Sequence, residues 1–296
     1  MSNFIRKYIL GAPEVSAAVP REPSMHPAAR ASSDIRTESL DNSIPYSPSP
    51  ADVGEVRALL KSTHPALPTE IADIILNFAD YSVKDVVTFN PSDVYRLSSR
   101  GPGVYGLILK GPQIRELKQY GLELRDLRLK AVRFEIASHD QGWGGEPGTQ
   151  GTYNCAFSWF EVTILRRLDH SSDRVEPTLT LGPDQRYESY IDYSNAYRRS
   201  GWDFATDDNG EMLIWPLQKN KVARREAQTR EIVWMLDDDS EGQQQAEPAE
   251  DSGSGPGRGF VRTLRSGDVI CLWARAMYPG WANLVEKAMI EVAYTD

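Results

Sequence analysis

Hydrophobic and polar residues alternate in short runs through the C-terminal two thirds of the chain, from residue 101 onwards. In residues 129–138, Val132, Phe134 and Ile136 alternate with smaller or charged side chains, which is the period of a strand with one buried face. Similar runs are rich in β-branched and aromatic residues and are bounded by Gly, Pro, Asp or Asn. They predict strands at residues 104–109, 129–137, 156–165, 187–191, 212–217, 230–236, 268–274 and 288–293.

Irregular connections join these predicted strands, and no strong helical pattern lies between them. An alternating βαβ architecture would need such helices. The pattern therefore predicts a mainly β fold, a β-sandwich or jelly-roll-like domain, for residues 101–296.

A helical period of about 3.6 residues replaces the alternation in the preceding segment, residues 52–100. Asp52 is expected to cap a short amphipathic helix. A second helix is expected to begin at Leu67-Pro68-Thr69-Glu70, because proline suits the first turn of a helix. Its apolar stripe is formed by Ile71, Ile74, Ile75 and Phe78.

Two further segments are too polar and too rich in Pro, Ser, Gly or Gln to bury much apolar surface. The predicted organisation is therefore a disordered arm at 1–51, a short helical segment at 52–100 and a β-sandwich domain at 101–296. A disordered insertion is expected inside that domain at 237–259.

The net charge of the chain and its lack of long apolar runs limit the classes of partner to be expected. A net charge of −9 and a pI near 5.1 disfavour nucleic acid, which normally selects a basic surface. No run approaches the roughly 18 apolar residues of a membrane-spanning helix, so no membrane insertion is expected. Residues 4–10 are interrupted by Arg6 and Lys7 and do not resemble a signal peptide. With a transit peptide as the alternative, the cytoplasm or nucleus is the expected location.

The chain contains two cysteines, Cys155 and Cys271, both within apolar, strand-like runs. Buried free thiols are the expectation for such positions. A disulfide is the alternative, although secreted proteins of this size usually contain more cysteines.

The most informative polar segment is the loop Ser138-His139-Asp140-Gln141-Gly142-Trp143, which follows a predicted strand. Polar side chains beside a tryptophan are typical of a recognition loop, so His139, Asp140, Gln141 and Trp143 are candidate ligand-binding residues. The alternative is that Asp140 and Gln141 satisfy backbone groups of the turn, with Trp143 folded into the edge of the core. Trp281, in the turn Tyr278-Pro279-Gly280-Trp281, is a further candidate as a surface platform.

No catalytic pattern accompanies this loop. His139 and Asp140 lack a serine in a Gly-x-Ser-x-Gly turn, and the histidines are not spaced like metal ligands. No glycine-rich phosphate loop lies between a strand and a helix, so no cofactor is expected. The sequence predicts a protein that is not an enzyme, with neither catalytic nor metal-binding residues.

The helix opening at Leu67-Pro68-Thr69-Glu70-Ile71 resembles the start of an F-box. Members of that family dock on the Skp1 adaptor of cullin ubiquitin ligases. The resemblance implies a Skp1-like protein partner that contacts Leu67, Pro68, Ile71, Ile74 and Ile75. Residues 83–97 depart from the family pattern, because they lack the Cys- and Trp-containing second half.

The segments SHDQGWGG, GTYNCAFSWFEV, RSGDVICLWARA and YPGWANLVEKAMIEV are together similar to an uncharacterised domain of filamentous-fungal proteins. The Trp-Phe-Glu strand is more distantly similar to the substrate-recognition domains of sugar-binding F-box proteins, which implies a glycan as an alternative partner.

Two functions follow from these patterns. One is a binding module for a protein or glycan partner, acting as a substrate receptor of a cullin-type ubiquitin ligase. The alternative is a structural or regulatory scaffold whose helices pack onto the β domain without docking an adaptor.

Overall fold

The computed structural model describes residues 47–115, 128–168, 186–187, 189–236 and 252–295. All of them belong to one compact unit, Tyr46–Asp296. The expected disordered arm lies outside the described residues up to residue 46. The same is true of residues 237–251 of the expected disordered insertion.

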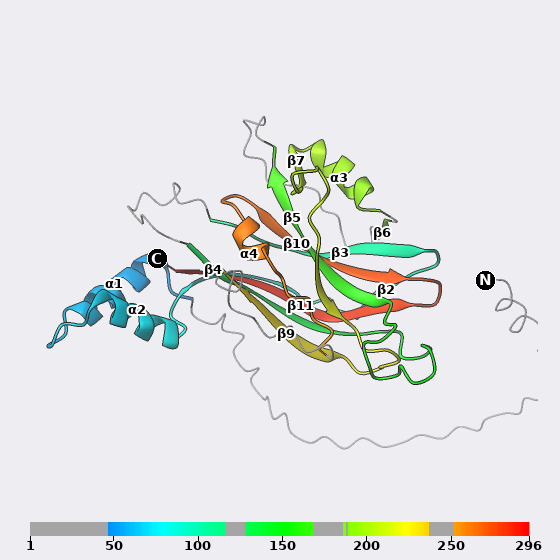
Figure 1. Ribbon diagram of the computed structural model, residues 1–296, viewed down its shortest axis with the longest axis horizontal. Coiled ribbons are helices and arrows are strands. Elements are labelled where there is room, and N and C mark those ends of the chain that lie inside the picture. Colours follow the sequence, from blue (N-terminus) through cyan, green and yellow to red (C-terminus); the bar gives the residue numbers. More distant parts are fainter. Residues whose placement is uncertain (1–46, 116–127, 169–185, 188, 237–251, 296) are drawn as a thin grey trace, which may run out of the picture. The chain divides into compact units, whose positions relative to one another are not determined.

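The strands form two antiparallel sheets (Figure 1). The first sheet contains β1 (Val83–Phe89), β2 (Tyr95–Ser98), β4 (Arg128–His139), β9 (Gln228–Met235) and β11 (Ala282–Thr295). Its order is β1-β11-β4-β9, with β2 also paired to β11. The second sheet contains β3 (Gly103–Gln113), β5 (Ser158–Arg167), β6 (Arg186–Tyr187), β7 (Trp202–Phe204), β8 (Trp215–Lys219) and β10 (Val269–Met277). Its order is β6-β3-β10-β5-β7, with β8 also paired to β5.

Side-chain alternation along the strands builds a core between the two sheets. Strand β4 contributes Val132, Phe134 and Ile136, the positions that alternation predicted, and β10 contributes Ile270 and Leu272 from the opposite sheet. All five side chains are fully buried. The predicted mainly β fold with a β-sandwich is confirmed.

Two helices, α1 (Pro50–Lys61) and α2 (Thr69–Phe78), lie side by side next to the sandwich (Figure 1). Each buries a narrow face, which consists of Pro50 and Val53 from α1 and of Ala72 and Leu76 from α2. No helix in the described ranges is long and apolar enough to cross a membrane.

Helix α1 begins earlier than the sequence predicted. Its cap is Ser49, and Asp52 is instead the partner in a capping box. The Asp52 carboxylate accepts the Ser49 backbone N–H at 2.8 Å, while the Ser49 hydroxyl oxygen accepts the Asp52 N–H at 3.2 Å. The expected arm therefore ends before residue 49.

The expected boundary at residue 100 is wrong. Strands β1 and β2 lie within the segment predicted to be helical, and both pair with β11. Strand β11 is 14 residues long and has β1 and β2 on one side and β4 on the other. The first sheet is thus completed by residues on the N-terminal side of the predicted domain.

A helix replaces the end of the strand predicted at 187–191: Tyr187 lies in β6, but residues 190 and 191 are helical. Helix α3 (Tyr190–Arg198) begins at Ser189, whose side chain accepts the Ile191 N–H at 3.1 Å. Tyr190, Tyr193 and Tyr197 lie on its buried face. Three aromatic residues in consecutive turns favour a helix, because their burial outweighs the strand propensity of each tyrosine.

Helix α3 covers the outer face of the second sheet and creates a second core there. Trp273 of β10 lies at its centre, fully buried, with ring centroids 4.5 Å from Tyr193 and 5.1 Å from Tyr190. The Trp273 indole N–H donates to the Thr163 hydroxyl at 2.9 Å. Strands β5 and β10 are therefore buried on both faces.

Residues 252–259, predicted as part of a disordered insertion, are ordered along β8. The Lys219 N–H donates to the Gly253 carbonyl, and the Gly255 N–H donates to the Leu217 carbonyl, both at 2.9 Å. A Cβ on Gly255 would lie 1.8 Å from the Pro216 carbonyl oxygen. Glycine is required here because the two backbones approach closely. A segment rich in glycine for this reason has the same composition as a flexible one. The segment leads into the short helix α4 (Phe260–Thr263).

A buried side-chain network joins the two sheets at the end of β4. Asn220 lies directly after β8 and is 5% exposed. Its amide accepts from the Ser138 hydroxyl of β4 at 2.8 Å and donates to the Ser158 hydroxyl of β5 at 3.1 Å. It also donates to Asn283 of β11 at 3.0 Å, and the Asn283 amide donates to the Trp159 carbonyl at 2.9 Å. One amide thereby connects strands of both sheets.

We expect Asn220→Ala to lower the free energy of unfolding by about 2–4 kcal/mol, because it leaves several buried polar groups without partners. Urea unfolding measures this loss. The matched control is Asn209→Ala in an exposed turn, for which we expect a change of about 0.5 kcal/mol or less. Equal effects of the two substitutions would contradict a structural role for the network.

Candidate functional site

The predicted recognition loop begins with the last two residues of β4, Ser138 and His139, and is held together by Asp140. This side chain is fully buried, and its carboxylate accepts three backbone N–H groups. The donors are Ala223 at 2.6 Å, Gly142 at 2.8 Å and Arg224 at 3.0 Å. Asp140 therefore fixes its own loop to the turn after β8 and does not face a ligand.

Burial raises the pKa of the Asp140 carboxyl, although the backbone N–H groups of Gly142, Ala223 and Arg224 act in the opposite direction. Gln141 also has a structural role. Its amide donates to the Trp143 carbonyl at 2.7 Å and accepts the Ala282 N–H of β11 at 3.1 Å. The alternative anticipated from the sequence, that Asp140 and Gln141 satisfy backbone groups, describes both residues.

His139 is half-buried, and its Nδ1 lies 2.7 Å from the Asp140 carbonyl oxygen. Trp143 differs from the other three loop candidates, because it is 58% exposed, so the part of the alternative that placed its ring in the edge of the core is wrong. A Cβ on Gly280 would lie 3.4 Å from the Trp143 ring, so this indole rests against the turn that contains Trp281.

Trp143 belongs to a group of aromatic residues at this end of the sandwich, here called the aromatic cluster: Trp143, Phe157, Tyr278 and Trp281. The Phe157 ring packs edge-on against Tyr278 and Trp281, with centroids 4.8 Å and 5.2 Å apart. Tyr278 is 48% exposed, and Trp281 is half-buried. Of the predicted ligand-binding residues, the structure thus brings Trp143 and Trp281 together at the surface.

A groove of about 470 Å³ begins beside the cluster and runs along the outer face of the second sheet. Phe157 belongs to both the groove and the cluster. The groove is formed by Ala156, Phe157, Trp159, Phe160, Pro216, Gln218, Lys219, residues 252–255 and Met277. Sequence analysis missed it, because it requires β8 and residues 252–255 to lie beside β5.

Next to the groove lies a buried charged cluster that the sequence analysis also missed. The Glu161 carboxylate of β5 accepts the Arg275 guanidinium of β10 and the Trp159 indole N–H, each at 2.6 Å, and also accepts the Tyr190 hydroxyl. The guanidinium carbon lies 3.4 Å from the Tyr105 ring centroid. Burial and the neighbouring Glu161 carboxylate raise the pKa of Tyr190. The signal available in the sequence was one acid and one arginine inside apolar strands.

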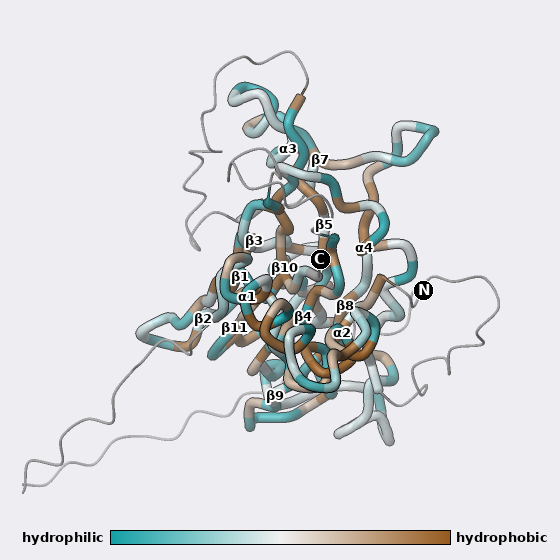
Figure 2. The backbone as a smooth tube through the Cα atoms, turned by 90° about the vertical axis from the view of Figure 1, so that its left-hand side faces the viewer, coloured by the Kyte–Doolittle hydropathy of each residue, from teal (hydrophilic) through white to brown (hydrophobic). Residues whose placement is uncertain are grey.

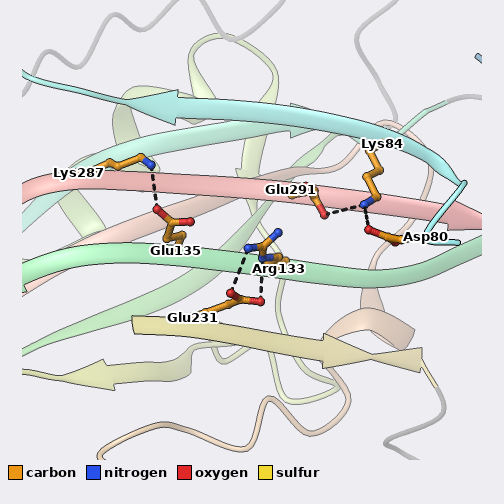
Figure 3. Close-up of polar contacts among 7 residues, drawn as sticks. All are labelled: Asp80, Lys84, Arg133, Glu135, Glu231, Lys287 and Glu291. Atoms are coloured by element: carbon orange, nitrogen blue, oxygen red, sulfur yellow. Dashed lines mark hydrogen bonds and ion pairs between the residues drawn. The ribbon is translucent and has the colours of Figure 1, made fainter. Parts of the chain in front are cut away.

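Several carboxylates on the first sheet are also paired with cations. On the outer face of the first sheet, Lys287 contacts Glu135 at 2.8 Å and Arg133 contacts Glu231 at 3.0 Å (Figure 3). Lys84 contacts Asp80 and Glu291 on the same face (Figure 3). Within the described part of the chain, no group of three His, Cys, Asp or Glu residues could hold a metal ion.

The predicted partner-binding stripe lies on the exposed side of α2. Ile71 is 42% exposed, Ile74 57%, Ile75 39% and Phe78 92%. Leu67 is half-buried, and Pro68 is exposed at the start of the helix. Figure 1 shows α2 at one end of the described part of the chain, and Figure 2, viewed from that end, shows hydrophobic (brown) stretches along the helix. This apolar helix face has no partner among the described residues.

Neither a known protein family nor a curated protein matches this chain.

We expect Asp140→Ala to lower the free energy of unfolding by about 2–4 kcal/mol, because three backbone donors lose a buried acceptor. Trp143→Ala should change it by less than about 1 kcal/mol, since the ring is largely exposed. Urea unfolding of both variants tests the difference. A destabilising Trp143→Ala together with a neutral Asp140→Ala would contradict these roles.

The two cysteines differ in exposure. Cys271 is fully buried in the second core, as expected, but Cys155 is exposed, with a φ of 55° in the turn before β5. The expectation of a buried Cys155 is therefore wrong. The apolar residues that suggested it belong to the turn and to the strand that follows. Both thiols are free.

Burial raises the pKa of the Cys271 thiol to about 12. We therefore expect a thiol reagent at neutral pH to label the exposed Cys155 of the folded protein quickly. It should label the buried Cys271 only after unfolding. Mass spectrometry of the labelled peptides identifies the residue. Rapid labelling of Cys271 in the folded protein would contradict the described packing.

Proposed function

We propose that this protein is a non-enzymatic binding module that docks onto a protein partner through helix α2. The observation that carries the proposal is the exposure of Ile71, Ile74, Ile75 and Phe78, which occupy one helix face. Full burial of one such side chain contributes about 1.5–3 kcal/mol. Large apolar residues at this spacing are the anchors of a helix that binds in a groove of its partner.

A Skp1-like adaptor is the partner proposed for this face, because the helix opens with the F-box-like sequence Leu67-Pro68-Thr69-Glu70. The protein would then serve as a substrate receptor of a cullin-type ubiquitin ligase. The two helices are attached firmly enough for this role: Val53 and Leu76 reach the main core, and Arg57 contacts Asp73 at 2.7 Å.

The aromatic cluster is the proposed surface for the recruited protein. Strand β11 pairs with His139 through Leu284 at one end, next to the cluster, and Tyr294 near its other end adjoins α1 and α2. The ten residue-to-residue steps from Leu284 to Tyr294 span about 33 Å of extended chain. A partner on α2 and a second protein on the cluster would therefore not compete for space.

The scaffold function remains the second candidate, and one observation favours it. Strands β1 and β2 continue directly from α2 into the first sheet, so the helices are part of the fold and not a separate docking domain. In that case the apolar face of α2 would bind no Skp1.

Pull-down of purified Skp1 by the full-length protein tests the proposal. We expect Ile74→Ser and Phe78→Ser each to weaken binding by at least about tenfold, because each removes about 1.5–3 kcal/mol of apolar burial. The matched control is Leu59→Ser, which removes an apolar side chain that is 60% exposed on α1. It should leave binding unchanged.

Urea unfolding of the same variants should show little change, since the substituted side chains are exposed. Failure of the unmodified protein to bind Skp1 would reject the adaptor assignment and favour the scaffold. Equal losses with Leu59→Ser would show that the contact is not specific to α2.

A further inference from the structure

We propose that the groove beside the aromatic cluster binds a small amphipathic anion: a flat aromatic or aliphatic body that carries one carboxylate. This site is separate from the α2 face, so the inference does not depend on the adaptor assignment. Its volume, about 470 Å³, lies within the range of small-molecule sites, about 300–1,000 Å³.

The walls of the groove are built before any ligand binds. One wall is the paired backbone of β8 and residues 252–255, fixed by the hydrogen bonds from Lys219 to Gly253 and from Gly255 to Leu217. Another is β5, whose Trp159 pairs with Lys219 across the ladder. A site formed by strand pairing keeps its shape, which favours a compact, rigid ligand.

The aromatic side chains of the groove offer carbon atoms and no free donor. The indole N–H of Trp159 is already bound to Glu161 at 2.6 Å. Phe157 and Met277 add a ring and a thioether, and Pro216 adds an aliphatic ring. These groups bind a flat apolar body by contact and exclude water from it.

The polar side chains of the lining are largely occupied by one another. The Gln218 amide donates to the Lys219 carbonyl at 2.9 Å and to the Ser252 carbonyl at 3.1 Å. Its oxygen accepts the Ser254 hydroxyl at 2.6 Å. A sugar needs several directed donors and acceptors, and this lining has few left to offer. The groove therefore favours an amphipathic ligand over a glycan.

Lys219 sets the charge of the ligand. Its side chain is exposed and lines the groove, and no carboxylate among the described residues lines the groove with it. No ion pair involving its ammonium group occurs within the described ranges. An ammonium at the edge of an apolar groove attracts a single negative charge while the rest of the ligand remains in contact with the rings.

The test uses 2-naphthoate as the probe and its neutral amide, 2-naphthamide, as the comparison. Binding to the full-length protein is followed by the indole N–H signal of Trp159 in ¹H–¹⁵N spectra, assigned by its loss in Trp159→Phe. We expect saturable naphthoate binding with a Kd at or below about 1 mM. Naphthamide should bind about two- to fivefold more weakly, because it lacks the contact with Lys219.

Two pairs of variants locate the site. Lys219→Gln should weaken naphthoate about two- to fivefold without affecting naphthamide. Lys221→Gln removes the same charge from a side chain that lies over the Tyr153 ring, outside the groove lining, and should affect neither probe. Ala156→Phe should fill the groove and weaken both probes at least tenfold, whereas Ala156→Ser should not.

Near-UV circular dichroism checks that each variant is folded. If Ala156→Phe does not fold, the comparison of acid and amide in Lys219→Gln still decides the matter. The proposal is overturned if the Trp159 signal does not respond to naphthoate, or if the amide binds as tightly as the acid. Equal effects of Lys219→Gln and Lys221→Gln would overturn it as well.

Discussion

The side-chain amide of Asn220 is the interaction on which the arrangement of the two sheets depends. A buried amide must find partners for its donors and its acceptor, and unpaired groups would cost more than the hydrogen bonds contribute. Here the partners come from β4, β5 and β11, so the amide is satisfied only when the two sheets meet in one register. Apolar contacts between the sheets supply most of the stability, but they are not directional. The network fixes the position of the loops that follow β4 and β8.

The sandwich could be predicted because alternation reports directly on a buried strand face, as Val132, Phe134 and Ile136 show. Two kinds of local pattern misled the prediction. At 187–191, strand propensity favoured a strand, although Tyr190 is the first of three tyrosines, at 190, 193 and 197, that form one face of a helix. In 252–259, glycines that allow close packing have the composition of a flexible segment. Local composition does not contain the tertiary contact that decides either case.

The candidate site was predicted in part. The loop was expected to begin at Ser138, but Ser138 and His139 still belong to β4. The sequence could not distinguish Asp140, which binds backbone groups, from Trp143, which is exposed. That distinction depends on the turn after β8, which is distant in the chain. Glu161 and Arg275 escaped notice for the same reason: each looks like an isolated charge until β5 and β10 are paired. Removing one partner of such a buried pair strongly destabilises the folded protein, because the other charge is left buried and unpaired.

Gln218, Lys219 and Asn220 are consecutive in the chain, and this has a consequence for ligand binding in the groove. Lys219 lines the groove, while the next residue joins both sheets and the preceding one holds residues 252–255. The backbone that carries the charged side chain is thus preorganised, and a ligand bound there would need to order little besides the lysine side chain itself. The entropy cost of ordering the backbone, which binding to a mobile loop would include, is met here during folding. The free energy of contact with even a small ligand is then reduced little by ordering of the protein.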